Sequence, residues 1–538
     1  MQPSTQAQLA IMCKEDTNTK PIFSYEDVRK HNKHGDSWLV IHGKVYNVSE
    51  FDHPAGDVIQ IGYGREATAL YESHHGLIRN DKNEMKFQRL LKKYEIGTVR
   101  NPPKQPEYNS PFARELKEKC QEAMKKEGRV TQVAPNWLDF SVVPLRPLLI
   151  LLAAYMTATT RGWEVYAWAY FWGITLTAGQ GMLHAASHRG LSRNYYINMF
   201  CRVFGETWGL REANWEFGHV ISHHMECYTQ QDYMIDQHVP PEFFRIYEST
   251  PYVERYKYQH IWYVISIPLA IMNGGVRWNC APFSLILPFK KLYESMRTMN
   301  NIHKTPFPGP RNMPPGSSHT DEEFKPDDTL NGPHRFMIFE SLCWQIRAFI
   351  LGNVITLPVF LTLCKHRSIL EASFIMLFAY GTQSAAVVEN TLTQHLVEDV
   401  IVHPTKMFQN DWYAHQIASS SEVKDSGFKD KISDYIGWQV CHHSFPPLWG
   451  SHAVLLQPIM AEVTKKHNVP YLVFTMREAR ESVFRFLWKH STPNCDNPPK
   501  TPFWASFLLY YFSFNFLNKM IALYLMATTA VSLVGMAM

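Results

Sequence analysis

The sequence predicts a multi-domain chain: a small α+β domain followed by an all-α integral membrane domain of about four transmembrane helices, capped by a histidine-rich region. Three observations predict it. Residues 21–100 mix short alternating stretches with a helical pattern. Beyond Pro144, four charge-free runs are long enough to approach a bilayer crossing. Three short windows that concentrate histidine lie near the ends of these runs.

Composition excludes several function classes. A net charge of +4, from 53 basic and 49 acidic residues, with no basic patch interleaved with aromatics, argues against a nucleic-acid partner. The nine cysteines are scattered without a C-x-x-C pair, so they form neither a disulfide framework nor a zinc ribbon. The mean hydropathy of -0.25 resembles that of a soluble protein, but the apolar residues cluster after Pro144.

The domain boundaries follow from shifts in composition. Residues 1–20 surround a very short apolar run with charges, so they lack the centre of a signal peptide; we expect a disordered N-terminus that stays cytosolic. Prolines and a charged run predict a linker that continues into a polar helix. The expected order is 1–20 disordered, 21–100 α+β domain, 101–135 linker, 136–490 membrane domain and 500–538 apolar membrane-associated segment.

The clearest transmembrane run has 19 residues without a charge, and short turns join the four runs into two hairpins. Both hairpin tips should then lie on one side of the membrane and everything else on the other. Assigning the tips to the lumen places Lys365 and Arg367 against the positive-inside tendency. The runs are Val165–Leu183, Pro147–Thr160, Ala348–Cys364 and Ala372–Val388.

Two further segments are less regular. Tyr258–Ile271 is apolar and aromatic but short, which favours an interfacial or re-entrant helix over a span. Residues 292–335 are rich in proline, glycine and charge, which predicts a surface insert.

A His-Pro-Ala-Gly turn marks the first candidate site. Pro54 fixes one backbone angle and Gly56 permits a positive one, so the turn can hold His53 at a set angle. A second imidazole, His75, follows 22 residues later, next to His74. Two imidazoles from opposite walls of a cleft can fill both axial positions of a haem iron, which suits electron transfer. The same residues alone could also be a turn histidine and two polar residues at a helix end.

The surrounding sequence resembles the cytochrome b5 fold. The stretch from Phe23 to Val99 holds the motifs Trp38-Leu39-Val40, Val45-Tyr46-Asn47-Val48, Gly64-Arg65-Glu66-Ala67-Thr68 and Tyr71-Glu72-Ser73-His74-His75. This resemblance implies haem b with His53 and His75 as axial ligands, and His74 as the alternative to His75. Ala55 departs from the usual H-P-G-G turn.

The histidine windows mark the second candidate site. Residues i and i+4 share a helix face, so His184 with His188, and His219 with His223, could each direct two imidazoles at one point. An isolated pair could equally be polar packing. Seven histidines exceed the needs of one zinc ion, and H-E-x-x-H is absent, so a two-metal centre is favoured, although imidazole also suits zinc, copper and nickel. The candidates are His184, His188, His219, His223, His224, His442, His443 and, after the fourth run, His395.

Residues 137–487 are similar to the membrane fatty-acid desaturases, whose three boxes run H-x(3,4)-H, H-x(2,3)-H-H and [HQ]-x(2,3)-H-H. Gln439, at the head of the third box, is typical of the front-end group with a fused cytochrome b5 domain. The resemblance implies that the eight histidines hold two non-haem irons, with dioxygen as co-substrate. Gln439 would act at the same centre by orienting a neighbour or a water. Ala185 replaces the usual Asp of box one, and Gln394 the usual Asn before His395.

The implied function is front-end desaturation of a fatty-acyl chain, carried as a CoA ester or a phospholipid, in polyunsaturated fatty acid synthesis. Electrons would come from an NADH-cytochrome b5 reductase. The location would be the endoplasmic reticulum membrane, multi-pass, with the haem domain and the boxes cytosolic. Two alternatives remain: a lipid hydroxylase or sphingoid-base desaturase with the same centre, and a catalytically silent haem-bearing membrane protein.

Overall fold

The computed structural model describes residues 20–54, 56–78, 81–102, 104–129, 137–208, 212–228, 232, 234, 244–248, 250–263, 280–282, 334–400, 407–424 and 438–493. The expectations for residues 1–19, Ala55, the insert up to residue 333, the tail 500–538 and the second half of Tyr258–Ile271 lie outside these residues.

The N-terminal domain is an α+β unit, as the sequence predicts. Its five-stranded sheet has the order β1-β5-β4-β3-β2, with β1 and β5 parallel and the other pairs antiparallel. The turn between β3 and β4 has positive φ at His42 (49°) and Gly43 (73°), which suits the right-handed twist of a hairpin. The elements are β1 (Ile22–Phe23), α2 (Tyr25–Lys30), β2 (Asn32–Lys33), β3 (Asp36–Ile41), β4 (Lys44–Asn47), η1 (Gly56–Gly62), α3 (Thr68–His75), α4 (Asp81–Tyr94) and β5 (Glu95–Val99).

The stretch expected to be a linker holds a docked helix, α5 (Pro111–Lys126). Its Phe112, Leu116 and Cys120 are buried in the same core as α21 (Gly450–Lys466), so the helix is amphipathic rather than polar all round. Lys119 Nζ lies 2.6 Å from Glu462 Oε1 across this contact. Residues 111–126 therefore belong to the packed body instead of forming a free tether.

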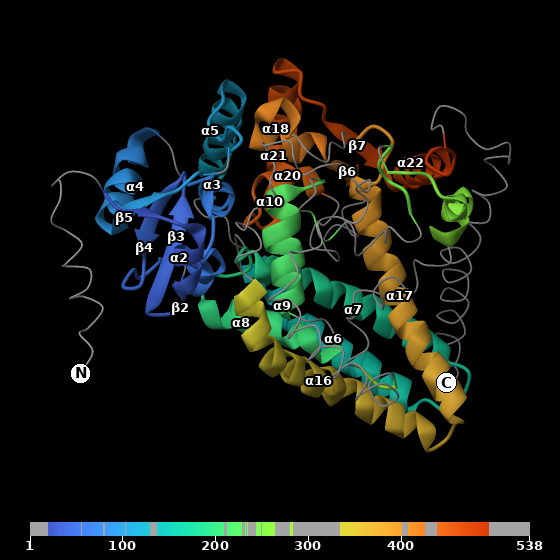
Figure 1. Cartoon of the computed structure of the whole chain (residues 1–538). Coiled ribbons are helices and arrows are strands. Elements are labelled where there is room, and N and C mark those ends of the chain that lie inside the picture. The colour runs from blue at the N-terminus through green and yellow to red at the C-terminus, as the bar shows by residue number, and fades with distance from the viewer. Residues whose placement is uncertain are drawn as a thin grey trace, which may run out of the picture.

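Four long helices contain the four charge-free runs apart from Thr160, which follows the end of α6, and Figure 1 shows them crossing in the lower half of the molecule. α7 packs against α6 and α17, and α16 packs against α6. Gly173 makes the close approach of α7 to α17 possible, because a Cβ there would lie 2.5 Å from the Ala379 carbonyl oxygen. The helices are α6 (Trp137–Thr159), α7 (Val165–Ser187), α16 (His334–Cys364) and α17 (Ile369–His395).

Within the described residues, one helical segment, Ile346–Cys364, is long and apolar enough to cross a membrane, and Pro144–Thr159 is a shorter apolar helix. The count of four spans therefore stays a prediction. α7 and α17 carry polar residues such as Gln180, Gln383 and Glu389 along their inner halves, which lowers their average hydropathy.

The two hairpin tips lie together, as the short turns predict. Arg367 Nη2 donates to the carbonyl oxygens of Arg161 at 2.6 Å and Gly162 at 2.7 Å. A cation at this tip therefore satisfies backbone carbonyls beyond the end of α6.

A polar cap covers the opposite ends of α7 and α17. Its two short strands pair in parallel. The cap comprises α8 (Tyr195–Gly205), η2 (Glu206–Trp208), α9 (Glu212–Trp215), the π-helical η3 (Glu216–His223), α10 (His224–Glu226), η4 (Glu254–Tyr258), η6 (Phe408–Asn410), α18 (Trp412–Ala418), β6 (Ser421–Lys424), α20 (Gln439–Ser444), α21, β7 (Leu472–Thr475) and α22 (Met476–Lys489).

Candidate metal centre

The eight histidines come from four segments that the fold brings to one place between the long helices and the cap. They form two neighbouring groups, in each of which the candidate ligand atoms lie within 4.8 Å of one another. The groups adjoin, since the ring of His224 stacks on that of His443 with centroids 4.4 Å apart. The first group is His184, His188, His219, His224 and His442, and the second is His223, Cys227, His395 and His443.

The backbone of box two decides which histidines pair. α7 is a regular helix, and His184 and His188 share a group, as their spacing predicts. The expected pairing of His219 with His223 is wrong. Glu216–His223 is π-helical, so residues five apart align, and His219 Nε2 lies 3.1 Å from His224 Nε2. His223 instead joins the second group.

Polar neighbours orient the imidazoles of the second group. His223 Nδ1 lies 2.9 Å from Asp232 Oδ2, and His395 Nδ1 lies 3.1 Å from the Ser419 carbonyl oxygen. His443 Nδ1 lies 2.9 Å from Gln416 Oε1. All three partners are acceptors, so each Nδ1 carries the proton and donates it. Each Nε2 then keeps a lone pair for a metal ion.

Burial and neighbouring charges favour the neutral form of three of the imidazoles. Burial, followed by the neighbouring histidines, holds the pKa values of His219, His224 and His443 well below 6.5. These three imidazoles are therefore neutral at physiological pH, which is the form that binds metals.

Buried imidazole nitrogens that lack a hydrogen-bond partner indicate whether the two groups suit metal ions. Among the residues that the structure describes, both ring nitrogens of His188, Nε2 of His223 and Nε2 of His442 are buried without a hydrogen-bond partner. A buried polar atom left unpaired costs about 1–3 kcal/mol. Metal coordination removes that cost, so the two groups of imidazoles fit a two-metal centre.

Gln439 lies within the second group. Its Nε2 is 3.1 Å from His395 Nε2 and 3.0 Å from His443 Nε2, so the amide can donate to both lone pairs. Turned end for end, the amide would present its carbonyl oxygen at the same place. Gln439 is thus in direct contact with two candidate ligands.

Several supporting residues escape sequence reasoning. Asp232 lies apart from α18, which carries Gln416 and is followed directly by Ser419, and no periodicity links these residues to the boxes. Cys227 joins the second group, but its Sγ lies 3.8 Å from Nδ1 of His395, on the side that faces the Ser419 carbonyl. Cys227 therefore contacts the Nδ1 side of the His395 ring, away from Nε2.

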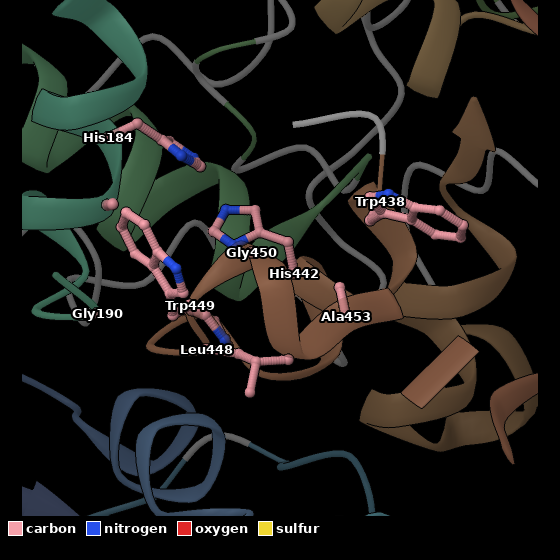
Figure 2. A pocket seen from close by; sticks show the side chains of 10 residues that line it. His184, Gly190, Trp438, His442, Leu448, Trp449, Gly450 and Ala453 are labelled. Atoms are coloured by element: carbon pink, nitrogen blue, oxygen red, sulfur yellow. The ribbon is translucent and has the colours of Figure 1, made fainter. Parts of the chain in front are cut away.

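A pocket opens at the edge of the first group (Figure 2). In Figure 2 the indole of Trp449 lies beside His442, one of the two ligand candidates that line the pocket. Within the described part of the chain, the indole nitrogens of Trp438 and Trp449 are buried without an acceptor. Ala185, the departure in box one, lines this pocket, so the missing carboxylate leaves room there. The lining residues are His184, Ala185, Gly190, Trp438, His442, Pro446, Leu448, Trp449, Gly450 and Ala453.

The N-terminal domain holds a second candidate site. The rings of His53 and His75 are 6.0 Å apart. That separation leaves room for one metal ion between the two rings, given metal–nitrogen bonds of about 2 Å. His75 Nδ1 donates to the Tyr71 carbonyl oxygen at 2.7 Å, which leaves its Nε2 for coordination. Phe51 and Phe87 contact the two rings edge-on.

Comparisons with known proteins show similarity to a haem-binding family and to desaturases. The family described as Cytochrome b5-like Heme/Steroid binding domain matches residues 24–100. Acyl-lipid (8-3)-desaturase B of Dictyostelium discoideum is 26% identical over 88% of this chain and 95% of its own length. Acyl-lipid (8-3)-desaturase of Physcomitrium patens is 24% identical over 86% of this chain and 89% of its own length. Delta(8)-fatty-acid desaturase 1 of Arabidopsis thaliana is 23% identical over 86% of this chain and 92% of its own length.

No solved structure matches the chain. The resemblance to desaturases with a fused cytochrome b5 domain is confirmed over most of the chain, and the matched domain supports haem as a cofactor.

Proposed function

We propose that the chain is a membrane-bound, oxygen-dependent fatty-acyl desaturase of the front-end type, serving polyunsaturated fatty acid synthesis. The observation that carries the proposal is the convergence of eight histidines into two adjoining groups, in a chain similar to named desaturases over most of its length. The hydroxylase, sphingoid-base and silent alternatives are not favoured by these relatives.

Two non-haem irons would be held by the two groups. His184, His188, His219, His224 and His442 would hold one, and His223, His395 and His443 the other. When bound, the irons supply the activation of dioxygen needed to break an unactivated C–H bond. The reaction balances as one CH2–CH2 unit, O2, two electrons and two protons giving one CH=CH unit and two waters.

The chain's own residues would hold and shield this centre. Asp232, Gln416 and the Ser419 carbonyl fix the tautomers of three imidazoles. Trp215 stacks on His219 with ring centroids 4.4 Å apart and donates to Ser187 Oγ at 3.1 Å. These contacts keep the rings from turning and keep bulk water away from the donors.

His53 and His75 would bind haem b in the N-terminal domain. With both histidines bound to its iron, the haem would supply electron transfer and would not bind oxygen. We infer an NADH-cytochrome b5 reductase as the source of electrons and the endoplasmic reticulum as the membrane. The joined hairpin tips support a topology in which the haem domain and the cap share the cytosolic side.

The substrate is an acyl chain, attached to a phospholipid or to CoA. The names of the relatives, which include acyl-lipid desaturases, support the lipid-linked form. A narrow apolar channel would select the carbon by position, because successive methylene groups are chemically alike.

Expression in a host that lacks polyunsaturated fats tests the proposal. The host is fed candidate acids, and mass spectrometry locates new double bonds in each lipid class. We expect a new double bond on the carboxyl side of an existing one, absent with His219→Ala. A hydroxylated product or a modified sphingoid base would support the related alternatives, and no product from a protein without iron would support the silent one.

A further inference from the structure

Helix α3 connects the two candidate sites. Its last residue, His75, lies opposite His53 in the haem cleft. Its other side docks on the cap: Tyr413 Oη donates to the Glu72 carbonyl oxygen at 3.1 Å, and Ser73 Oγ lies 3.8 Å from Met225 Sδ. Figure 1 shows the N-terminal domain beside α5 and α10.

The docked residues are neighbours of the candidate metal ligands along the chain. Met225 directly follows His224, and Phe445 comes two residues after His443. Gly76 at the end of α3 has no room for a side chain, because a Cβ would lie 2.5 Å from Tyr413 Oη and 3.4 Å from Phe445. The haem-ligand helix is thus in close contact with the wall of the metal centre.

His74 lies in α3, the helix that joins the two candidate sites. Its Nε2 is buried, and its Nδ1 lies 3.1 Å from Ser73 Oγ. Electrostatic interactions connect the ring with His75, His188 and Arg189. His74, which directly precedes His75, therefore belongs to the contact between α3 and the part of the cap that follows His224.

We propose that His74 bridges the haem and the first metal group, and that its imidazole lies on the path of the electrons between them. The inference rests on the proposed function. Each passage takes one electron from a ferrous haem, which becomes ferric, and gives it to one ferric iron, which becomes ferrous. Two passages support each turnover, and a reductase supplied with NADH restores the haem. No bond forms at His74 and no proton leaves it.

The competing explanation is that His74 only fills the docked surface. Tyr413→Phe is the matched control, because it removes a hydrogen bond to α3 and leaves His74 in place. The conservative variant His74→Phe keeps a ring of similar size at the bridging position. A structural role and a bridging role of His74 therefore predict different rankings of these variants by the rate of haem oxidation.

The test follows haem oxidation by stopped-flow absorbance. Full-length protein carrying haem and iron is reduced without oxygen, then mixed with oxygen and an acyl substrate found by the feeding experiment. We expect haem oxidation in His74→Ala to be at least about tenfold slower than in the wild type, with haem spectrum and iron content unchanged. Tyr413→Phe should stay within about twofold of the wild type, and His74→Phe should recover much of the rate.

Separate outcomes refute separate steps. A wild-type rate in His74→Ala overturns the bridge, as does equal slowing in His74→Ala and Tyr413→Phe. If dithionite, which reduces the irons directly, fails to restore a single turnover in His74→Ala, His74 acts on the chemistry rather than on transfer. If haem oxidation in the wild type does not respond to substrate, the proposed function itself fails.

Discussion

Replacing Asp232 by Asn should weaken the second metal group while leaving the first intact. The Asp232 carboxylate accepts from His223 Nδ1 and from the Tyr228 N–H, both at 2.9 Å, and from the Met234 N–H at 3.2 Å. Burial alone would raise the pKa of Asp232, but His223 and the Tyr228 N–H hold it below 3.8. The three groups named here are all donors, and a carboxylate can accept from them on both oxygens.

The size of the effect follows from these contacts. An Asn oxygen can replace Oδ2, but its NH2 then faces the Met234 N–H, and the negative charge that makes His223 a stronger donor to the metal is lost. Loss of such a supporting partner typically costs about 10- to 100-fold in metal affinity, or roughly 1.4–2.7 kcal/mol.

The assay is iron content after dialysis against a graded series of chelator concentrations. Asp232→Asn should lose about one of two irons at a chelator concentration that leaves the wild type loaded. Asp36→Asn is the matched control, because Asp36 pairs with His31 in the N-terminal domain, away from the cluster. Equal iron retention by Asp232→Asn and the wild type would refute the role of this carboxylate.

Three further predictions concern the haem ligands, Gln439 and Glu422. His53→Ala or His75→Ala in the full-length protein should abolish the absorption spectrum of reduced b-type haem, and a surviving spectrum would exclude that residue as an axial ligand. Gln439→Ala should retain most iron but lose much activity, whereas His443→Ala should lose both; equal loss of iron would make Gln439 a ligand. Burial raises the pKa of Glu422 to about 7. The Glu422 carboxyl is therefore neutral in the folded protein at low pH. As pH rises from about 4.5 through 7, keeping this buried group in the fold costs a growing part of the free energy of unfolding. Glu422→Gln should raise the melting temperature at about pH 8 and change it little at about pH 5, and equal shifts at both would contradict the assignment.

The sequence locates the long helices because charge-free runs reflect burial or lipid contact directly. It underestimates their lengths, since α7 continues to Ser187 and α17 to His395 as they enter the polar cap. Hydropathy falls there while the helices continue, so composition marks the apolar part and not the helix end. The docking of α5 is missed for the opposite reason: its single apolar face is hidden among lysines and glutamates.

The sequence also predicts all eight histidines as candidate metal ligands, because the repeated H-x-x-x-H and His-His spacings can be seen without a structure. Their division into groups is not. The pairing of His219 with His224 depends on π-helical backbone, and a five-residue repeat arises from tertiary packing rather than local propensity. Asp232 and Gln416 are likewise set by where separate segments meet.

The proposed function requires that the two histidine groups form a two-iron centre served by the haem domain. Elemental analysis of the purified full-length protein, with haem determined by its absorption, measures the metal content. We expect about two non-haem irons for each haem, and we expect His219→Ala to lose both irons together with desaturation. One zinc per chain and no iron beyond the haem would contradict it.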